Sequence, residues 1–203
     1  MIYVEQIEII SDQYPRADGC LKIGTKFECS DINIFVGEQG CGKSTLLSLL
    51  SNHGQKFKAS DDIKLILSKE AETDGVSMFY FDSEKDNPRM RDPEDYAGQE
   101  HGFITAALSR FRSHGEELSE IVISPLLTAK DCVIILDEPE SGLSVTNQYR
   151  LINAIKKAVE NNCQLFIATH CYPIIDAFDV ISLEHNKEMS GKEFLKIAKQ
   201  QKP

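Results

Sequence analysis

The chain has 203 residues, which is enough for one domain with a sizeable hydrophobic core. Its formal net charge of −10 disfavours generic binding to nucleic acid, because such binding depends on neutralising phosphates with basic side chains. No apolar stretch approaches the ~20 residues of a membrane span, and the first residues do not resemble a signal peptide. We therefore expect a cytoplasmic protein without a membrane span, and six cysteines that are reduced thiols.

The first part of the chain predicts strands on both sides of a short helix. Alternation, short apolar runs and the turn signal Asp18-Gly19 predict strands over Met1–Ile10, Cys20–Cys29, Ile32–Val36, Ile63–Leu67 and Val76–Phe81. A helix is expected over Lys43–Leu50, stopped by Asn52-His53-Gly54. The polar segment Asp82–Asp95 contains two prolines and predicts a loop.

The second part alternates helices with buried strands. Helices are expected over Phe103–Phe111, from near Gly115, over Thr146–Glu160 and over Ser190–Gln200. Apolar runs predict strands at Val133–Leu136, Leu165–Ala168 and Val180–Leu183. This alternation is typical of an α/β fold with a mostly parallel central sheet flanked by helices. The early strands are expected to form a separate antiparallel β piece.

A glycine-rich phosphate loop is the most specific motif in the chain. It has the pattern G-x-x-x-x-G-K-S and comprises Gly37, Glu38, Gln39, Gly40, Cys41, Gly42, Lys43, Ser44 and Thr45. Glycines let backbone N–H groups curl around a phosphate, and the helix that follows aims its positive end at the same anion. Lys43 would reach the β- and γ-phosphates, and Ser44 would hold Mg²⁺. A glycine-rich turn that carries a lysine by chance is the weaker interpretation, because a strand and a helix flank the loop.

Two buried strands end in polar side chains. After Val133–Leu136 come Asp137, which would hold Mg²⁺, and Glu138, which would act as the general base on the attacking water. The alternative is a strand that runs into an acidic surface turn. After Leu165–Ala168 comes His170, which would bind the γ-phosphate at the same sheet edge, unless it is an ordinary loop histidine.

The order of these parts resembles the ATP-binding cassette ATPases, over most of the chain. Ser141, Gly142 and Leu143 resemble the D-loop of that family, and His170 resembles its switch histidine. Ser113, His114, Gly115 and Glu116 stand where the signature sequence belongs, although the same residues could be a helix N-cap. The S-x-G-E form looks more like the non-transporter branch, which includes the structural-maintenance-of-chromosomes, RecF-type and overcoming-lysogenization-defect ATPases. The resemblance implies one P-loop domain over residues 1–203, with a small helical lobe at about 83–128.

The chain departs from the family pattern in two ways. No clear glutamine loop follows the strand Val76–Phe81; the acidic segment Asp82–Arg89 stands there, and Gln99 is the nearest glutamine. The interval from Ser51 to Arg112 is also too short for the coiled-coil arm that this branch often carries. We therefore expect an ATPase head without an arm.

The resemblance implies ATP and Mg²⁺ as cofactors and a head-to-tail homodimer that forms on ATP binding. The first hypothesis is an ATP-hydrolysing switch that gates a protein partner or a nucleic-acid transaction in DNA repair, chromosome maintenance or antiphage defence. The alternative is the nucleotide-binding subunit of a transporter, and a third is an interaction module with feeble turnover, which the intact Glu138 argues against. A nucleic-acid partner has no support from the net charge, and the terminal lysines are better read as a solvated helix face.

Overall fold

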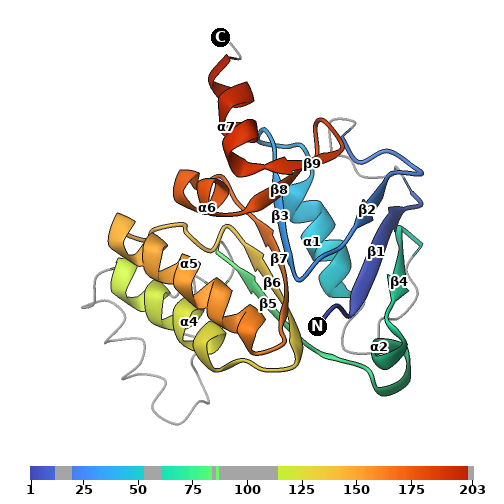
Figure 1. Cartoon of the computed structure of the whole chain (residues 1–203), viewed down its shortest axis with the longest axis horizontal. Coiled ribbons are helices and arrows are strands. Elements are labelled where there is room, and N and C mark those ends of the chain that lie inside the picture. The colour runs from blue at the N-terminus through green and yellow to red at the C-terminus, as the bar shows by residue number, and fades with distance from the viewer. Residues whose placement is uncertain (12–19, 53–60, 84–85, 87–113, 201–203) are drawn as a thin grey trace, which may run out of the picture.

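A six-stranded sheet forms the middle layer of the molecule in the computed structural model, which describes residues 1–11, 20–52, 61–83, 86 and 114–200 (Figure 1). For residues 114–119 only the backbone is described. The strands lie in the order β5 (Ser77–Asp82), β6 (Cys132–Asp137), β7 (Gln164–Ala168), β3 (Ile32–Val36), β8 (Asp179–Ser182) and β9 (Lys187–Ser190). All pairings are parallel except that of β9 with β8. The expected mostly parallel sheet is confirmed.

A second, three-stranded sheet forms the antiparallel piece that the sequence predicted. Its order is β2 (Lys26–Glu28), β1 (Val4–Ile9) and β4 (Ile63–Leu67). The side chain of Gln164, at the start of β7, joins it to the central sheet. Its Oε1 accepts hydrogen bonds from the N–H groups of Tyr3 and Val4 at 3.0 and 2.9 Å, and its Nε2 donates to Val4 O and Ser30 O.

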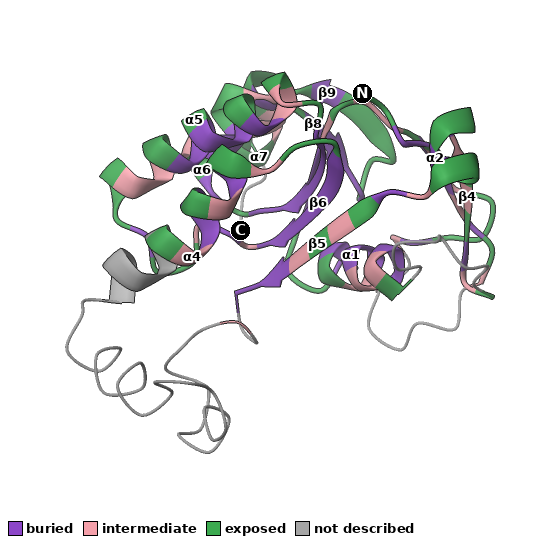
Figure 2. Cartoon of the chain, turned by 90° about the horizontal axis from the view of Figure 1, so that it is seen from below, coloured by how far each residue is buried: buried purple, intermediate pink, exposed green. Residues whose placement is uncertain are grey.

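Successive side chains of the central strands point to opposite faces of the sheet, so the hydrophobic core consists of two parts, one on each face. In β6, Ile134 and Leu136 face the layer of α4 (His114–Thr128), α5 (Val145–Glu160) and α6 (Tyr172–Ala177). Val133 and Ile135 face the opposite layer, which contains α1 (Lys43–Asn52) and the antiparallel sheet. Figure 2 shows the sheet buried between these layers and the outer sides of the helices exposed. The phosphate-loop helix α1 therefore lies on the side of the parallel sheet opposite α4, α5 and α6, together with the antiparallel sheet.

Three short elements were not expected from the sequence: α2 (Lys69–Asp74), α6 and β9. Each has few buried side chains, so its hydrophobic pattern is too short to be read. The terminal helix α7 (Gly191–Gln200) begins one residue later than expected, and the predicted helix Phe103–Phe111 lies outside the described residues. None of the helices in the described part of the chain is long and apolar enough to span a membrane. The single domain and its helical lobe stay predictions.

Candidate active site

The phosphate loop connects β3 to α1 through three glycines with positive φ, at Gly37 (150°), Gly40 (84°) and Gly42 (99°). A Cβ atom on Gly37 would lie 2.7 Å from the Sγ of Cys41 and would displace it, and the backbone conformation is one that side chains rarely adopt. Lys43 is only 5% exposed, and its ammonium group donates to the carbonyl oxygens of Gly37 and Glu38, both at 2.9 Å. The loop therefore wraps around the lysine charge.

Two oxygens that prefer a divalent cation meet at the start of α1. Ser44 Oγ donates a hydrogen bond to Asp137 Oδ1 at 3.1 Å, although these residues are 93 positions apart in the sequence. Asp137 ends β6, and the buried Asp82 ends the neighbouring β5 in direct register with it. Burial, together with the carboxylates of Asp82 and then Asp137, raises the pKa of Tyr80. The site is thus negatively charged and rich in oxygen.

A cavity of about 190 Å³ opens beside this pair, lined by residues of α1, β5 and β6 that include Ser48 and Tyr80. Hydroxyl and carboxylate oxygens are the donors that Mg²⁺ prefers. No group of three or more histidine, cysteine or acidic side chains gathers around a point within the described residues. This donor set fits an ion that has few protein ligands and takes its other ligands from phosphates and water.

Glu138 and His170 face each other across the ends of β6 and β7. His170 Nε2 lies 3.8 Å from Glu138 Oε1, and each side chain is 44% exposed. The backbone of Glu138 is left-handed, with φ of 48°, and its N–H donates to Ala168 O at 2.9 Å. Burial and the charge of Lys43 lower the pKa of His170, while Glu138 and Glu38 act against them. The imidazole is therefore biased toward its neutral form, which can accept a proton.

The residues predicted as the D-loop follow directly and turn the chain into α5. Ser141 N–H donates to Glu138 O, Gly142 has φ of 75°, and Leu143 is buried in the core. Ser144 then caps α5, with its side chain accepting from Asn147 N–H at 3.4 Å. The structure thus brings together the phosphate loop, Asp137, Glu138 and His170, with the D-loop residues beside them.

The predicted signature residues are only partly described. His114, Gly115 and Glu116 begin α4 as expected, but their side chains and all of Ser113 lie outside the described residues. Gln99 and most of the acidic segment lie outside them too. Sequence reasoning gave no definite role to Asp82, whose position follows from its register with Asp137. It also missed Glu140, whose contacts with the loop after β7 only the fold reveals.

The cysteines near the site are thiols, like the other described cysteines. Burial raises the pKa of Cys41, against the effect of Lys43, whose ammonium lies 3.7 Å from the sulfur. A neutral thiol is a weak nucleophile. Cys41 is therefore better explained as a small residue that the loop tolerates than as a reactive group.

Known proteins resemble the chain over nearly its whole length, although no family model matches it. The galactose/methyl galactoside import ATP-binding protein MglA of Fusobacterium nucleatum subsp. nucleatum is 23% identical, over 98% of this chain and 46% of MglA. The zinc import ATP-binding protein ZnuC of Vibrio parahaemolyticus is 25% identical, over 94% of this chain and 76% of ZnuC. The chain thus spans less than half the length of MglA.

A solved structure shows the same arrangement. The chain of a bacterial Atm1-family ABC exporter with ATP bound matches with a TM-score of 0.59 and 14% identity, over 97% of this chain and 41% of the exporter chain. The fold is therefore the P-loop fold of ATP-binding cassette ATPases. The relatives named here are transport proteins, so the expected placement in the non-transporter branch finds no support among them.

Proposed function

We propose that this chain is the ATP-binding domain of an ATP-binding cassette ATPase, which binds ATP with Mg²⁺ and hydrolyses it to ADP and phosphate. The observation that carries the proposal is the contact of Ser44 with Asp137, 3.1 Å long, beside a lysine held inside its own glycine loop. Side chains suited to a cation and a loop suited to a phosphate thus adjoin at one edge of the sheet, which supports the proposal. The named ATP-binding relatives support the same activity.

The chain's own groups have distinct roles in this proposal. Backbone N–H groups of the loop, the N-terminus of α1 and Lys43 bind the phosphates. Ser44 and Asp137 would hold Mg²⁺, which when bound supplies charge neutralisation at the phosphate oxygens. Glu138 accepts a proton from the attacking water, and His170 orients a γ-phosphate oxygen.

A homodimer on ATP binding belongs to the same proposal. The first N–H groups of a helix have no acceptor within the helix and attract anions, and α4 begins at the predicted signature. In the sequence, the predicted signature stands apart from the phosphate loop of its own chain. A γ-phosphate held by a second copy would fill that place. The dimer would then close around ATP and open after hydrolysis.

For the partner, the named relatives favour the alternative hypothesis over the first one. MglA and ZnuC are both named import ATP-binding proteins. By analogy with them, we propose that this chain binds a membrane-bound permease at the cytoplasmic face. The second candidate is an ATP-dependent switch of a protein effector, supported by the signature form S-x-G-E and by the lack of a clear glutamine loop in the sequence. A nucleic-acid partner has no support from either the net charge or the relatives.

The test traps the ATP-bound state with Glu138→Gln, which keeps the shape of the side chain but removes the base. We expect this variant to bind ATP, to dimerise in light scattering only with ATP and Mg²⁺, and to lose turnover by about 100-fold or more. A turnover rate near that of the wild type would place the base elsewhere.

A pull-down with the trapped dimer also distinguishes a permease partner from a soluble effector. Immobilised Glu138→Gln protein, loaded with ATP and Mg²⁺, is offered detergent-solubilised membranes and, separately, the soluble fraction of the same cells. Enrichment of a polytopic membrane protein supports the permease, and enrichment of a soluble effector alone supports the second candidate. Lys43→Ala protein on the same support is the matched control, because it should not take up ATP.

A further inference from the structure

Glu140 joins two loops that lie far apart in the sequence. Its Oε1 accepts a hydrogen bond from Thr169 Oγ1 at 2.6 Å and another from the N–H of His170 at 3.1 Å. The hydroxyl oxygen of Thr169 in turn accepts from the N–H of Cys171 at 2.9 Å. One carboxylate oxygen of Glu140 therefore binds the hydroxyl of Thr169 and the N–H of His170, and the same hydroxyl binds the N–H of Cys171.

The surroundings of this carboxyl group are unfavourable for a charge. Its second oxygen, Oε2, is inaccessible to solvent and has no hydrogen-bond partner among the described residues. Burial raises the pKa of Glu140 despite the hydrogen bonds from Thr169 and from backbone N–H groups, and the charge of Glu138 raises it further. The hydrogen bonds that Oε1 accepts are therefore made in surroundings that disfavour the ionised side chain.

The two joined loops carry the two groups that face each other in the site. Glu138 belongs to the loop after β6, two residues before Glu140, and His170 belongs to the loop after β7. Among the described backbone contacts of Glu138, one reaches β7: its N–H donates a hydrogen bond to Ala168 O. Among the described contacts, the hydrogen bond from His170 N–H to Glu140 Oε1 is the one that ties the backbone of His170 itself to the loop after β6.

We propose that Glu140 is the positioning residue for His170, holding the loop after β7 against the loop after β6 so that imidazole and Glu138 stay in mutual reach. The proposal rests on the roles proposed above for Glu138 and His170. Glu140 itself does not touch the reacting atoms. Its Oε1 holds the two loops together, because it accepts the hydrogen bonds from both Thr169 and His170.

The first test follows the titration of His170 by NMR, with the ring signal assigned through its loss in His170→Gln. The charged groups that influence this imidazole are Lys43, Glu138 and Glu38. Glu140→Ala should release the loop, expose the ring and let the pKa of His170 rise toward its ordinary value. Glu140→Gln keeps the Oε1 acceptor and should preserve the wild-type titration. This readout needs neither ATP nor turnover.

The second test measures ATP turnover. Glu140→Ala should lower kcat by about 10- to 100-fold with little change in KM for ATP, because misplacement of a catalytic group affects the transition state more than binding. Glu140→Gln should recover most of the lost kcat. Should Glu140→Ala fail to fold, Thr169→Val removes the 2.6 Å donor at nearly constant volume and should lower kcat in the same way.

Gln164→Ala is the matched control, because it removes a buried polar side chain that joins two segments at the opposite end of the same strand. It should lower the melting temperature but leave kcat and the His170 titration unchanged. The proposal is overturned if Glu140→Ala leaves both readouts at wild-type values, if Glu140→Gln is as impaired as Glu140→Ala, or if Gln164→Ala lowers kcat equally. Wild-type protein that does not hydrolyse ATP would refute the proposed function, while the NMR comparison would still decide the role of Glu140.

Discussion

Several residues of the site hold conformations or environments that their types normally avoid. Glu138 has a left-handed backbone, which costs a non-glycine residue on the order of 1 kcal/mol, and its N–H is held by Ala168 O. Lys43 is almost fully buried, and its ammonium group is bound by carbonyl oxygens of its own loop. Such residues cluster where function constrains the chain, which agrees with a site at this edge of the sheet.

Lys43→Ala should abolish ATP binding. The substitution removes the charge that the loop encloses and leaves the carbonyl oxygens of Gly37 and Glu38 pointing at a gap. An isothermal titration with ATP and Mg²⁺ measures the effect, and the circular dichroism spectrum checks that the variant is folded. Undiminished binding by a folded variant would contradict the assignment of the phosphate loop.

Glu140→Gln should become more stable relative to the wild type as the pH rises. Burial raises the pKa of Glu140, so the folded state holds this proton more tightly than the unfolded chain. The stability that the proton provides is complete below the unfolded pKa and is lost as the pH rises through the folded one. A glutamine does not ionise and escapes this loss. Urea unfolding at a series of pH values upward from about 4.5, the ordinary value of the group, measures the difference. A difference that stays constant or reverses in sign would refute the prediction.

At the scale of elements, the sequence predicts the buried strands best. The expected and observed bounds of β3 are the same, because it is a short, mostly buried apolar run between turn residues. The bounds of β4 also agree, although only Ile63 of that strand is buried. In β9 only Met189 is buried, and α6 carries a proline in its first turn, so neither has a readable hydrophobic period. Local pattern predicts an element where several apolar residues stand together, as they do in β3 and β4 but not in β9.

The same limit applies to the site. The positions of Asp137, Glu138 and His170 at the edge of the sheet could be predicted, because each lies within two residues of the end of a buried apolar run. Asp82 also follows such a run, but its neighbour Asp137 becomes visible only through the register of β5 with β6. Glu140 could not be predicted, because its partner Thr169 is 29 residues away and has no feature that singles it out.

A prediction about the ATP-dependent dimer concerns the start of α4. Gly115→Asp would place a negative charge and a side chain at the helix end where the phosphate of a second copy is proposed to bind. We expect the variant to bind ATP as a monomer but to lose both the dimer and turnover. Its mixture with Lys43→Ala protein should restore at most one working site per dimer.

Light scattering with ATP and Mg²⁺ checks this prediction, with Glu138→Gln as the positive control. An ATP-dependent dimer of Gly115→Asp would rule out a site shared between two copies. The segment at residues 113–117 would then be an ordinary helix start.

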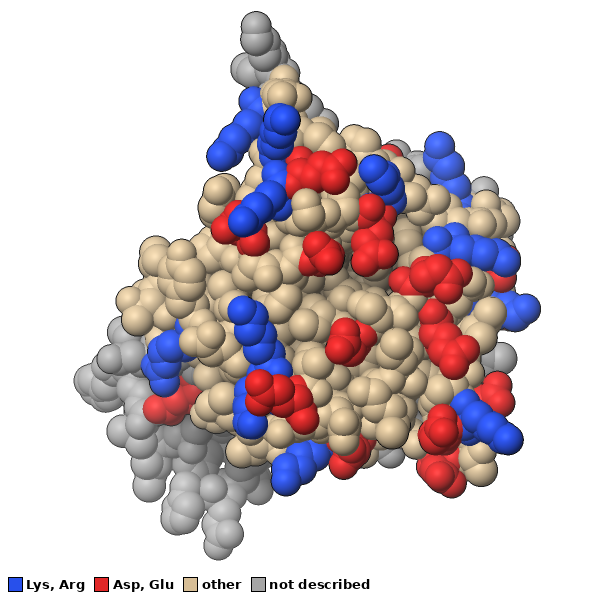
Figure 3. Space-filling view, in the orientation of Figure 1, with Lys and Arg blue, Asp and Glu red and all other residues tan. Residues whose placement is uncertain are grey.

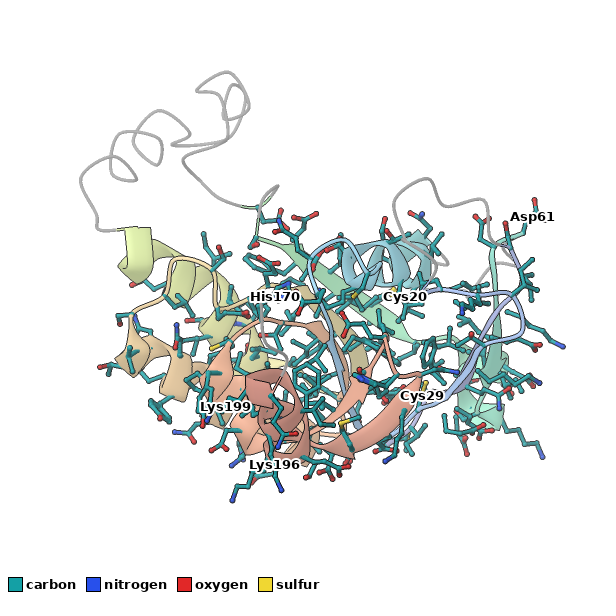
Figure 4. The ribbon with its side chains drawn as sticks, turned by 90° about the horizontal axis from the view of Figure 1, so that it is seen from above. Cys20, Cys29, Asp61, His170, Lys196 and Lys199 are labelled. Atoms are coloured by element: carbon teal, nitrogen blue, oxygen red, sulfur yellow. The ribbon has the colours of Figure 1, made fainter. Side chains whose placement is uncertain are left out.

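At the scale of the whole molecule, charges of both signs alternate over the face of the described residues that Figure 3 shows. Figure 3 shows acidic and basic side chains interspersed over one face, with lysines over α7. Lys196 and Lys199 lie on this helix, whereas His170 lies on the loop after β7 (Figure 4). The ammonium group of Lys199 lies 5.4 Å from the ring centre of Tyr172, and Lys187 pairs with Glu193 at 3.6 Å. These contacts agree with a solvated helix face, and the described residues on the face in Figure 3 form no continuous basic surface for nucleic acid.

The place of β3 between β7 and β8 has a consequence for the synthesis of the protein. The strand that leads into the phosphate loop leaves the ribosome early, but both of its sheet neighbours leave it late. Until then the apolar edge of β3 has no partner and depends on other protection, such as a chaperone. Arrested nascent chains that stop before Gln164 should therefore remain sensitive to protease around β3. Chains with β8 extended beyond the ribosome should become resistant in a single step.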